Sequence, residues 1–396
     1  MKKCDLKAVG LILMTLLLAT CGKMDDKRKL LAEIQVVRSE YAPDKRTALF
    51  DISVVDAQNN FVLAGESNRP DAVEALKTKL KSDGIEFRDS IEILPSKKLN
   101  GKTEALINIS VANLRSEPKH SAELSTQATL GTPVKILKKE GGWYLIQTPD
   151  KYLAWVDDGG IVPMEPKYMD NWKTTHKVIY TKTYGHSYAL PDHKQPVSDL
   201  VAGNILEIVK YVDEHYIVRY PDGRQAYVSK EESEPYRQWL EKLTPSIDSI
   251  VSTSMSLIGV PYLWGGTSTK GMDCSGFTKT VYFLNGMVIP RDASQQVHTG
   301  KAIDSVGSFE TLQKGDLLFF GSKATDSTPE KVVHVGIWIG NNEFIHASDM
   351  VRISSMDRDA ENYDDFNRDR YLRTKRILKQ QDEGLISLLD TPLFKD

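Results

Sequence analysis

Apolar and polar residues alternate through the middle of the chain in short runs that end at turn-forming dipeptides. Alternation of this kind predicts β-strands with one buried face. Residues 131–156 align without a gap on residues 203–228, with Pro149-Asp150 meeting Pro221-Asp222. Because the apolar positions also match between the two copies, the pattern predicts a small β-barrel that occurs twice.

A helical pattern appears later in the chain. After Asp273 the apolar residues Phe277, Val281 and Leu284 recur at helical spacing. Asp is a favoured N-cap residue, so we expect a helix whose first residue is Cys274. A thiol in the first turn would lie at the positive end of the helix dipole, which favours the thiolate.

The run from 332 to 340 is rich in β-branched residues and predicts a strand. Asn341-Asn342 supplies a turn, and residues 343–347 predict a second strand. The hairpin would place His334 and His346 on neighbouring strands.

The N-terminal third has a mixed pattern. Residues 71–82 predict an amphipathic helix through Val73, Leu76 and Leu80, and they lie between strand-like runs at 48–55 and 91–94. A small α/β module is therefore expected, as a spacer or as a docking domain.

Length and charge narrow the possibilities. A chain of 396 residues is long enough for two to four domains. The net charge of −3 comes from mixed signs, and no basic run interleaved with aromatic residues is present, which argues against nucleic-acid binding.

Cysteine usage points to one reactive residue. The chain has three cysteines, of which Cys4 and Cys21 fall in an N-terminal export signal. An exported protein would keep Cys274 as its single internal thiol. Free cysteines are often buried and inert, but the first turn of a helix instead suggests a nucleophile.

A cysteine nucleophile needs a base and a group that orients the base. His334 is the candidate base and His346 the candidate orienting group, although a histidine in a strand can also be purely structural. The histidines lack compact metal-ligand spacing with further cysteines or carboxylates, so we expect no metal and no cofactor.

Five motifs in order carry a family resemblance: residues 261–266 (PYLWGG), 273–276 (DCSG), 291–296 (RDASQQ), 315–320 (GDLLFF) and 334–337 (HVGI). Residues 246–378 resemble the NlpC family of bacterial cell-wall cysteine peptidases, thiol proteases with a reduced papain-like α+β fold. The resemblance implies that Cys274 is the nucleophile, His334 the base and His346 the third polar residue. It also implies a substrate groove lined by Tyr262, Asp273, Ser275 and Ser294.

The repeated segment resembles the bacterial SH3-like domains that accompany such enzymes, on residues 113–118, 130–134 and 142–144. In family members of this layout, the first SH3-like domain grips the free amino group of an N-terminal L-Ala with an acidic and an aromatic side chain. The resemblance suggests Glu123 and Tyr152 for those roles, with Glu117 and Trp155 as alternatives.

The N-terminus resembles a lipoprotein signal. Lys2 and Lys3 precede an apolar run from Ala8 to Ala19, which is too short for a stable transmembrane helix, and the run ends at Cys21. The resemblance implies cleavage before Cys21, lipidation of that thiol and attachment to a membrane. The expected location is the cell envelope, in the periplasm or at the outer-membrane surface of a Gram-negative bacterium.

The predicted fold is multidomain: two small SH3-like β-barrels and an α+β papain-like NlpC domain, preceded by a small α/β module. The predicted boundaries are a signal peptide (1–21), the N-terminal module (22–104), two SH3-like domains (105–166 and 170–232), a linker (233–245), the peptidase domain (246–378) and a peripheral tail (379–396).

The resemblance implies a monomeric hydrolase that acts on murein peptides of the form L-Ala-γ-D-Glu-diamino acid. It would cut between γ-D-glutamate and the diamino acid. Three alternatives remain open: an amidase or hydrolase that acts on intact peptidoglycan, an acyltransferase, or a non-catalytic wall-binding lipoprotein. The diamino acid, diaminopimelate or lysine, is also left open.

Overall fold

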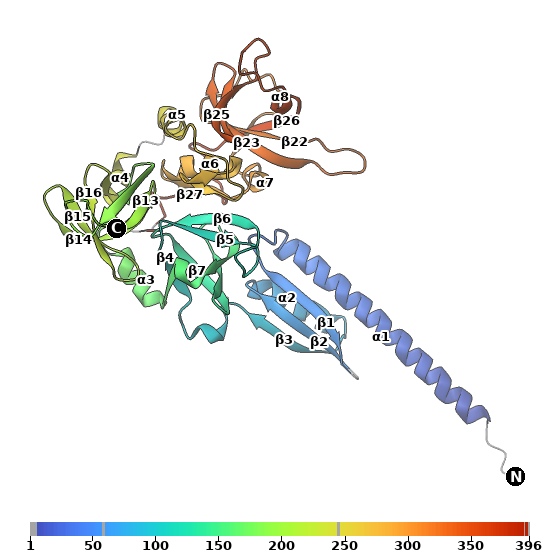
Figure 1. Ribbon diagram of the computed structural model, residues 1–396. Coiled ribbons are helices and arrows are strands. Elements are labelled where there is room, and N and C mark those ends of the chain that lie inside the picture. The colour runs from blue at the N-terminus through green and yellow to red at the C-terminus, as the bar shows by residue number, and fades with distance from the viewer. Residues whose placement is uncertain (1–5, 58–59, 244–245, 392, 395–396) are drawn as a thin grey trace. The chain divides into compact units, whose positions relative to one another are not determined.

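The computed structural model describes residues 6–57, 60–243, 246–391 and 393–394, with side chains from residue 24 onward (Figure 1). Lys2, Lys3 and Cys4 of the expected signal lie outside the described residues, and Cys21 is described by its backbone alone. The chain divides into two compact units, Met1–Lys98 and Leu99–Asp396. Among the described helices, none is both long enough and apolar enough to cross a membrane.

The first unit contains a three-stranded sheet and two helices: α1 (Leu6–Tyr41), β1 (Phe50–Asp56), β2 (Phe61–Ser67), α2 (Pro70–Ser82) and β3 (Phe87–Ile93). The strand order is β1-β2-β3, with β1 antiparallel and β3 parallel to β2. Helix α2 was predicted correctly, and its residues Val73, Leu76 and Leu80 are fully buried. The sequence analysis missed β2 because its two ends carry different patterns, with three consecutive buried residues at the start.

The second unit begins with a seven-stranded sheet, called here the first sheet: β4 (Glu104–Ile107), β5 (Val111–Arg115), β6 (Leu124–Thr129), β7 (Pro133–Glu140), β8 (Trp143–Gln147), β9 (Leu153–Asp157) and β10 (Ile161–Met164). Its order is β10-β4-β7-β8-β9-β5-β6. The 3-10 turn Lys97–Leu99 precedes β4, and a second, Asp158–Gly160, precedes β10. Since β4 pairs with β7 and β10, the end of the predicted 22–104 module belongs to this sheet.

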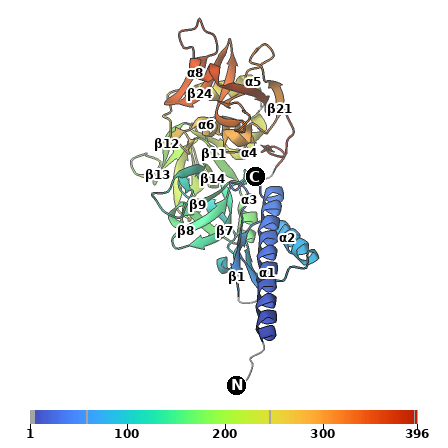
Figure 2. The same cartoon turned by 90° about the vertical axis from the view of Figure 1, so that its right-hand side faces the viewer.

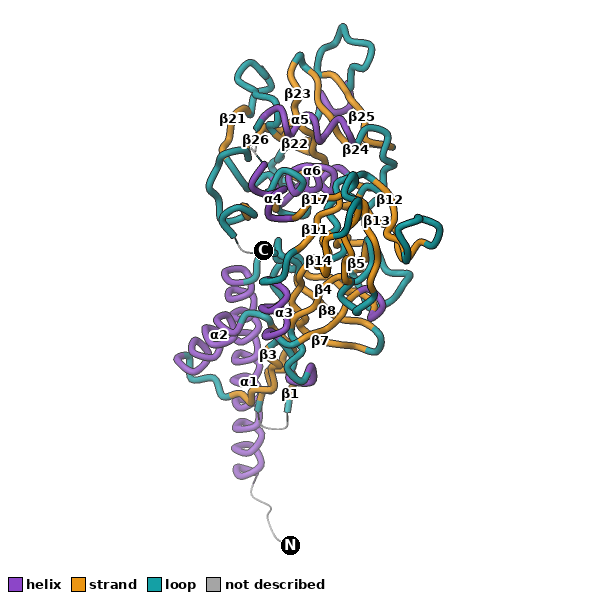
Figure 3. Tube along the Cα trace, turned by 90° about the vertical axis from the view of Figure 1, so that its left-hand side faces the viewer, coloured by secondary structure: helices purple, strands orange, loops and turns teal. Residues whose placement is uncertain are grey.

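A second seven-stranded sheet follows helix α3 (Pro166–Lys173), so that strands make up most of residues 104–235 (Figure 3). The second sheet contains β11 (Lys177–Tyr180), β12 (Tyr184–Tyr188), β13 (Pro196–Val201), β14 (Ile205–Tyr211), β15 (His215–Arg219), β16 (Gln225–Ser229) and β17 (Ser233–Pro235). Its order, β17-β11-β14-β15-β16-β12-β13, repeats the order of the first sheet strand for strand.

The pairing register also repeats. Tyr144 lies opposite Val156 in the first sheet, and Tyr216 lies opposite Val228 in the second. Both sheets carry a bulge at the equivalent place, after Ile136 and after Ile208. The repeat predicted from the sequence is therefore a repeat of strand order and register.

The rest of the second unit contains a six-stranded antiparallel sheet and several helices. The helices are α4 (Tyr236–Lys242), α5 (Ile247–Ser256), α6 (Cys274–Phe283), α7 (Ala293–Gln296) and α8 (Asp365–Asp369). The sheet order is β21-β26-β22-β23-β24-β25, from strands β21 (Lys301–Asp304), β22 (Leu317–Ser322), β23 (Lys331–Gly340), β24 (Glu343–Ser348), β25 (Met350–Ser355) and β26 (Tyr371–Arg376). Two short pairs complete it: β18 (Thr267–Ser268) with β19 (Gly271–Met272), and β20 (Met287–Val288) with β27 (Ile386–Ser387).

Helix α6 packs against β23 and β24 (Figure 2), and its buried residues Phe277 and Val281 share one apolar core with Val335 and Ile345 of those strands. The predicted helix start at Cys274 and the predicted hairpin are confirmed. Asn341 and Asn342 both have positive φ angles, as a tight hairpin turn requires.

Two boundary predictions were wrong. The expected linker at 233–245 contains β17, which pairs with β11, and helix α4, which buries Tyr236 and Trp239; residues 244–245 lie outside the described residues. The tail after Leu378 is not peripheral, because β27 pairs with β20 and Phe394 is 1% exposed against Tyr236. In both segments, buried aromatic residues fix the chain to the core despite the surrounding charged residues.

Candidate active site

Cys274 is the first residue of α6 and is 7% exposed. The cap is Asp273, whose Oδ1 accepts a hydrogen bond from the Gly276 N–H (2.7 Å), while its Oδ2 accepts one from the Gly265 N–H (2.9 Å). Gly276 has no room for a side chain, since a Cβ there would lie 1.9 Å from the Gly266 carbonyl oxygen. The cap and this close approach fix the loop of residues 261–266 against the start of the helix.

His334 and His346 interact directly across the hairpin. His334 Nε2 lies 2.7 Å from His346 Nδ1, and His346 Nε2 lies 2.9 Å from Ser354 Oγ on β25. Both imidazoles are buried, at 8% and 0% exposure. Asp364 Oδ2 stands 3.8 Å from His346 Nε2.

Burial keeps both histidines neutral. It lowers the pKa of His334 well below its usual value, and the nearby His346 and Arg370 lower this pKa further. Burial, with Arg352 and Arg370, lowers the pKa of His346 to about 3. A neutral imidazole has one N–H, so His334 can accept a proton on Nδ1 only if its Nε2–H donates to His346. His346 then donates its own Nε2–H to Ser354 Oγ, a partner that the sequence analysis missed.

The thiol of Cys274 lies against the backbone of Val335, the residue after His334. Burial, with the charge of Asp273, raises the pKa of Cys274 to about 12, so the resting group is a neutral thiol. The backbone N–H groups of Val335 and Ser275 and the charge of Arg291 lower this pKa, in the direction expected for a helix start, but burial outweighs them.

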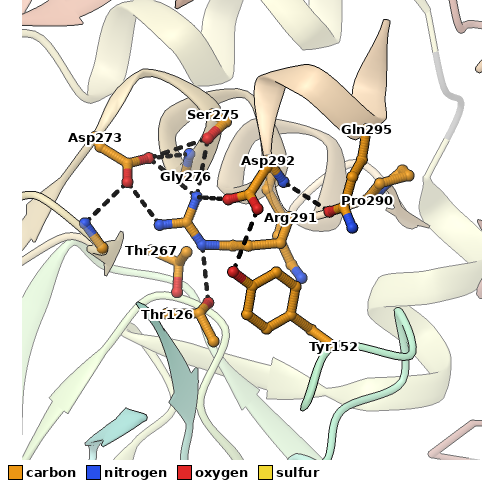
Figure 4. Close-up of polar contacts among 12 residues, drawn as sticks. Thr126, Tyr152, Thr267, Asp273, Ser275, Gly276, Pro290, Arg291, Asp292 and Gln295 are labelled. Carbon is orange, nitrogen blue, oxygen red and sulfur yellow. Dashed lines mark hydrogen bonds and ion pairs between the residues drawn. The ribbon is translucent and has the colours of Figure 1, made fainter. Parts of the chain in front are cut away.

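Arg291 organises the polar side of the site (Figure 4). Its guanidinium donates to both carboxylate oxygens of Asp273 (2.6 and 3.1 Å) and to Ser275 Oγ (2.9 Å). Its Nε donates to Thr126 Oγ1 of β6, at 2.9 Å, and the side chain is 1% exposed. The carboxylates of Asp273 and Asp292 raise the pKa of Arg291 against the opposing effect of burial.

The sequence analysis quoted Arg291 within a motif without giving it a role. Its partners Asp273 and Thr126 stand 18 and 165 residues away in the chain. No local pattern connects residues at such separations.

Two of the four candidates on the first sheet contact the region around α6. Glu123 accepts a hydrogen bond from Trp264 Nε1 at 2.7 Å, and the Tyr152 hydroxyl donates to Asp292 Oδ2 at 3.2 Å. Gln127 adds a contact, because its Oε1 accepts from the Thr267 N–H at 3.0 Å. The first sheet therefore borders the nucleophile loop.

Glu117 and Trp155 make other contacts. Glu117 pairs with Lys119 at 2.8 Å, and Trp155 lies under the Lys138 ammonium, 5.1 Å from its ring centre. Both contacts stay within the first sheet and its loops.

A pocket of about 900 Å3 opens beside His334. Tyr262 and Ser354 contribute to its wall, together with Arg352, Asp364 and Arg370. Burial, with Cys274 and Asp273, raises the pKa of Tyr262 to about 12, so its hydroxyl stays protonated. Ser294 is half-buried in α7 and does not line this pocket.

Among the described residues, no group of three or more His, Cys, Asp or Glu side chains could hold a metal ion.

Similarity to known proteins identifies the family of this chain. The NlpC/P60 family matches residues 259–367, and the chain is 34% identical over 234 residues to a γ-D-glutamyl-L-lysine dipeptidyl-peptidase of Bacillus cereus, spanning 57% of this chain and 67% of that protein. The chain belongs to the NlpC/P60 family. This NlpC/P60 protein is a cysteine peptidase, and its residues 110–161 match the bacterial SH3 domain, which places that domain on the first sheet.

Two further relatives extend the match. A dipeptidyl-peptidase 6 of Lysinibacillus sphaericus is 28% identical, over 64% of this chain and 92% of its own. The crystal structure of an NlpC/P60 family protein from Bacillus cereus superposes with a TM-score of 0.60 at 27% identity, covering 70% of this chain and all of that one.

Proposed function

We propose that this NlpC/P60 peptidase hydrolyses the bond between γ-D-glutamate and an L-diamino acid in cell-wall peptides that begin with a free L-Ala. Relatives from two Bacillus species are named γ-D-glutamyl-L-lysine dipeptidyl-peptidase. The observation that carries the proposal is the Glu123 carboxylate, held by Trp264 at the edge of the nucleophile loop.

In the proposed mechanism, His334 takes the proton of Cys274 as the sulfur attacks the carbonyl carbon. The imidazolium of His334 then protonates the leaving nitrogen, which releases the diamino acid and leaves a thioester. Water attacks the thioester with His334 as base. The backbone N–H of Cys274 is positioned at the helix start to stabilise the oxyanion. Of the four residues expected in the substrate groove, Tyr262 lines the pocket beside His334 and is proposed to contact substrate. Asp273 and Ser275 are proposed to position the nucleophile through Arg291, and Ser294 does not line this pocket.

Recognition of the peptide N-terminus is proposed for Glu123 and Tyr152. Glu123 uses one carboxylate oxygen on Trp264, and its second oxygen has no partner among the described residues. Tyr152 brings the Asp292 carboxylate to the same border of the first sheet. A primary ammonium suits such an acidic and aromatic site, and the first sheet would exclude longer, blocked chains.

Product analysis by mass spectrometry tests the proposal. The protein is incubated with L-Ala-γ-D-Glu-L-Lys, its N-acetylated form and intact peptidoglycan, beside Cys274→Ala. We expect release of lysine from the free peptide alone. Equal cleavage of the blocked peptide or the wall contradicts N-terminal recognition, and activity of Cys274→Ala contradicts the mechanism.

We also propose that the second sheet, residues 170–232 with the added strand β17, is a second SH3-like domain. Its strand order and register repeat those of the first sheet. Separate expression of residues 105–166 and 170–235 tests whether each sheet folds, and a fragment that stays unfolded by circular dichroism argues against independent domains.

The proposed location is the cell envelope, with the monomeric protein attached to a membrane through lipidated Cys21. The apolar run that ends at Cys21 supports this. Metabolic labelling with a radioactive fatty acid should label the wild-type protein and not Cys21→Ser. Label that persists in the variant rules out Cys21 as the lipid site.

A further inference from the structure

The pocket beside His334 is lined by charged side chains that have no role in the proposed mechanism. Its volume of about 900 Å3 is within the roughly 300–1,000 Å3 range of small-molecule sites. It carries both signs of charge, from the side chains of Arg352, Arg370, Asp349, Asp364 and Asp365. An amino acid with both a carboxylate and an extra ammonium group matches such a lining.

Arg370 is the unusual member of this set. Its Nε and Nη2 donate to one neutral oxygen, Asn367 Oδ1, at 3.2 and 2.9 Å, and the guanidinium lies 3.9 Å from the ring centre of Phe366. Within the part of the chain that the structure describes, Arg370 has no ion pair. The carboxylate of Asp364 instead accepts hydrogen bonds from Asn367.

Arg352 differs from Arg370 in this respect. Its Nη1 lies 3.6 Å from Asp349 Oδ2, and its side chain is 46% exposed. Burial lowers the pKa of Arg370, so its surroundings supply too little negative charge to offset desolvation. A half-buried guanidinium with unused N–H donors can bind a carboxylate from a ligand.

Arg370 also lies close to the reacting groups. It lines the same pocket as His334, and its charge lowers the pKa of that imidazole. In the proposed mechanism His334 protonates the leaving nitrogen, and the α-carboxylate of the leaving residue is two bonds from that nitrogen. A group held near His334 is therefore within reach of Arg370.

We propose that Arg370 binds the α-carboxylate of the leaving diamino acid, and that the pocket beside His334 is the site of a carboxy-terminal diamino acid. This inference rests on the proposed function. Asp349 and Asp365 line the same pocket and suit the side-chain ammonium of that residue. Peptides in which the diamino acid continues into a further residue lose the contact with Arg370.

Two matched substrates test the inference: L-Ala-γ-D-Glu-L-Lys with a free carboxylate and the same peptide as a C-terminal amide. Lysine isolates the α-carboxylate because its side chain has none. With the full-length protein we expect kcat/KM for the acid to exceed that for the amide by about ten- to a hundredfold, the usual range for a charge-assisted hydrogen bond. Arg370→Gln should bring the ratio of kcat/KM for the acid to that for the amide close to one, because any effect of the lost charge on His334 acts on both substrates alike.

Arg358→Gln is the matched control, because Arg358 is exposed between β25 and α8, in the same connection that leads to Arg370, and does not line the pocket. It should keep the preference, and Arg370→Lys should keep part of it. Turnover of the amide by each variant reports that the site is folded.

Equal rates for acid and amide in the wild-type protein overturn the inference. An equal loss on both substrates in Arg370→Gln also overturns it, because a charge effect on His334 alone does not distinguish them. Failure of the proposed function looks different: neither peptide is then cut between glutamate and lysine.

Discussion

Arg291 and Asp273 form a buried, two-bond ion pair directly behind the nucleophile, with oxygen-to-nitrogen distances of 2.6 and 3.1 Å. Asp273 caps the helix that begins at Cys274, and Arg291 also donates to Thr126 of the SH3 domain. The pair therefore connects the start of the catalytic helix to the neighbouring domain. A change at Arg291 reaches the thiol through Asp273 without touching substrate.

Arg291→Met should destabilise the protein strongly, because it leaves the buried Asp273 carboxylate without its partner. Loss of one member of a buried pair costs about 3–5 kcal/mol in free energy of unfolding. Urea unfolding of the second unit measures this cost. Arg219→Met is the control, since Arg219 is 43% exposed and its pair with Glu207 lies at the surface. An equal loss of unfolding free energy in the two variants would show that the buried pair stabilises the protein no more than the surface pair does.

Ser354→Ala should lower kcat by roughly fivefold with little change in KM, which corresponds to one lost hydrogen bond of about 1 kcal/mol. The hydroxyl fixes the proton of His346, and through it the proton of His334, so its loss allows the unproductive tautomer. Steady-state kinetics measure the effect. Ser256→Ala serves as control, because Ser256 is exposed and its hydroxyl donates only to the nearby Thr253 carbonyl oxygen among the described residues. A rise in KM alone would instead place Ser354 in substrate binding.

Local patterns were sufficient for the elements that carry the chemistry. Helical spacing after Asp273 located α6, and the β-branched run around His334 located β23, because in both segments one periodicity extends over several residues. The repeat at residues 131–156 and 203–228 located three pairs of strands.

The roles and elements that the sequence analysis missed depend on contacts between residues that are far apart in the chain. Thr126 and Ser354 look like ordinary strand residues until the fold brings them to Arg291 and His346. Strand β2 and the buried tail at Phe394 were missed for a related reason, since the pattern of each depends on what packs against it. The protonation state of Cys274 depends on burial, which no motif reveals.

Acid should destabilise the protein below about pH 6.5. This pH is well above the ordinary pKa values of carboxylates, which are about 4. The pKa of His346 is about 3 in the folded protein, so the unfolded chain binds the extra proton first. Stability from this group is complete above the unfolded value of about 6.5 and falls by about 1.4 kcal/mol per pH unit as pH decreases toward the folded value. Urea unfolding at several pH values measures the slope.

His346→Gln should reduce that slope by the contribution of His346, since glutamine does not titrate, and leave the contribution of His334, whose pKa burial also lowers. His298→Gln should leave it unchanged, because His298 is exposed. A slope that is undiminished in His346→Gln would assign the acid sensitivity to other groups.

Alkylation of Cys274 should accelerate steadily from pH 6 to pH 10 without a plateau. The pKa of the thiol is raised to about 12 and that of His334 is lowered, so neither an ion pair nor a free thiolate is populated at neutral pH. The rate then follows the small thiolate fraction, which grows about tenfold per pH unit.

A protein that begins at residue 22 carries Cys274 as its one thiol, so iodoacetamide consumption reports on it directly. The same chain in urea is the control and should level off above about pH 8.5, the ordinary cysteine value. A plateau in the folded protein between pH 6 and pH 8 would instead reveal a thiolate–imidazolium pair, and deprotonation of Cys274 would then precede substrate binding. Without that plateau, proton transfer to His334 must accompany attack on the substrate, which makes the position of His334, held by His346 and Ser354, part of the rate-determining geometry.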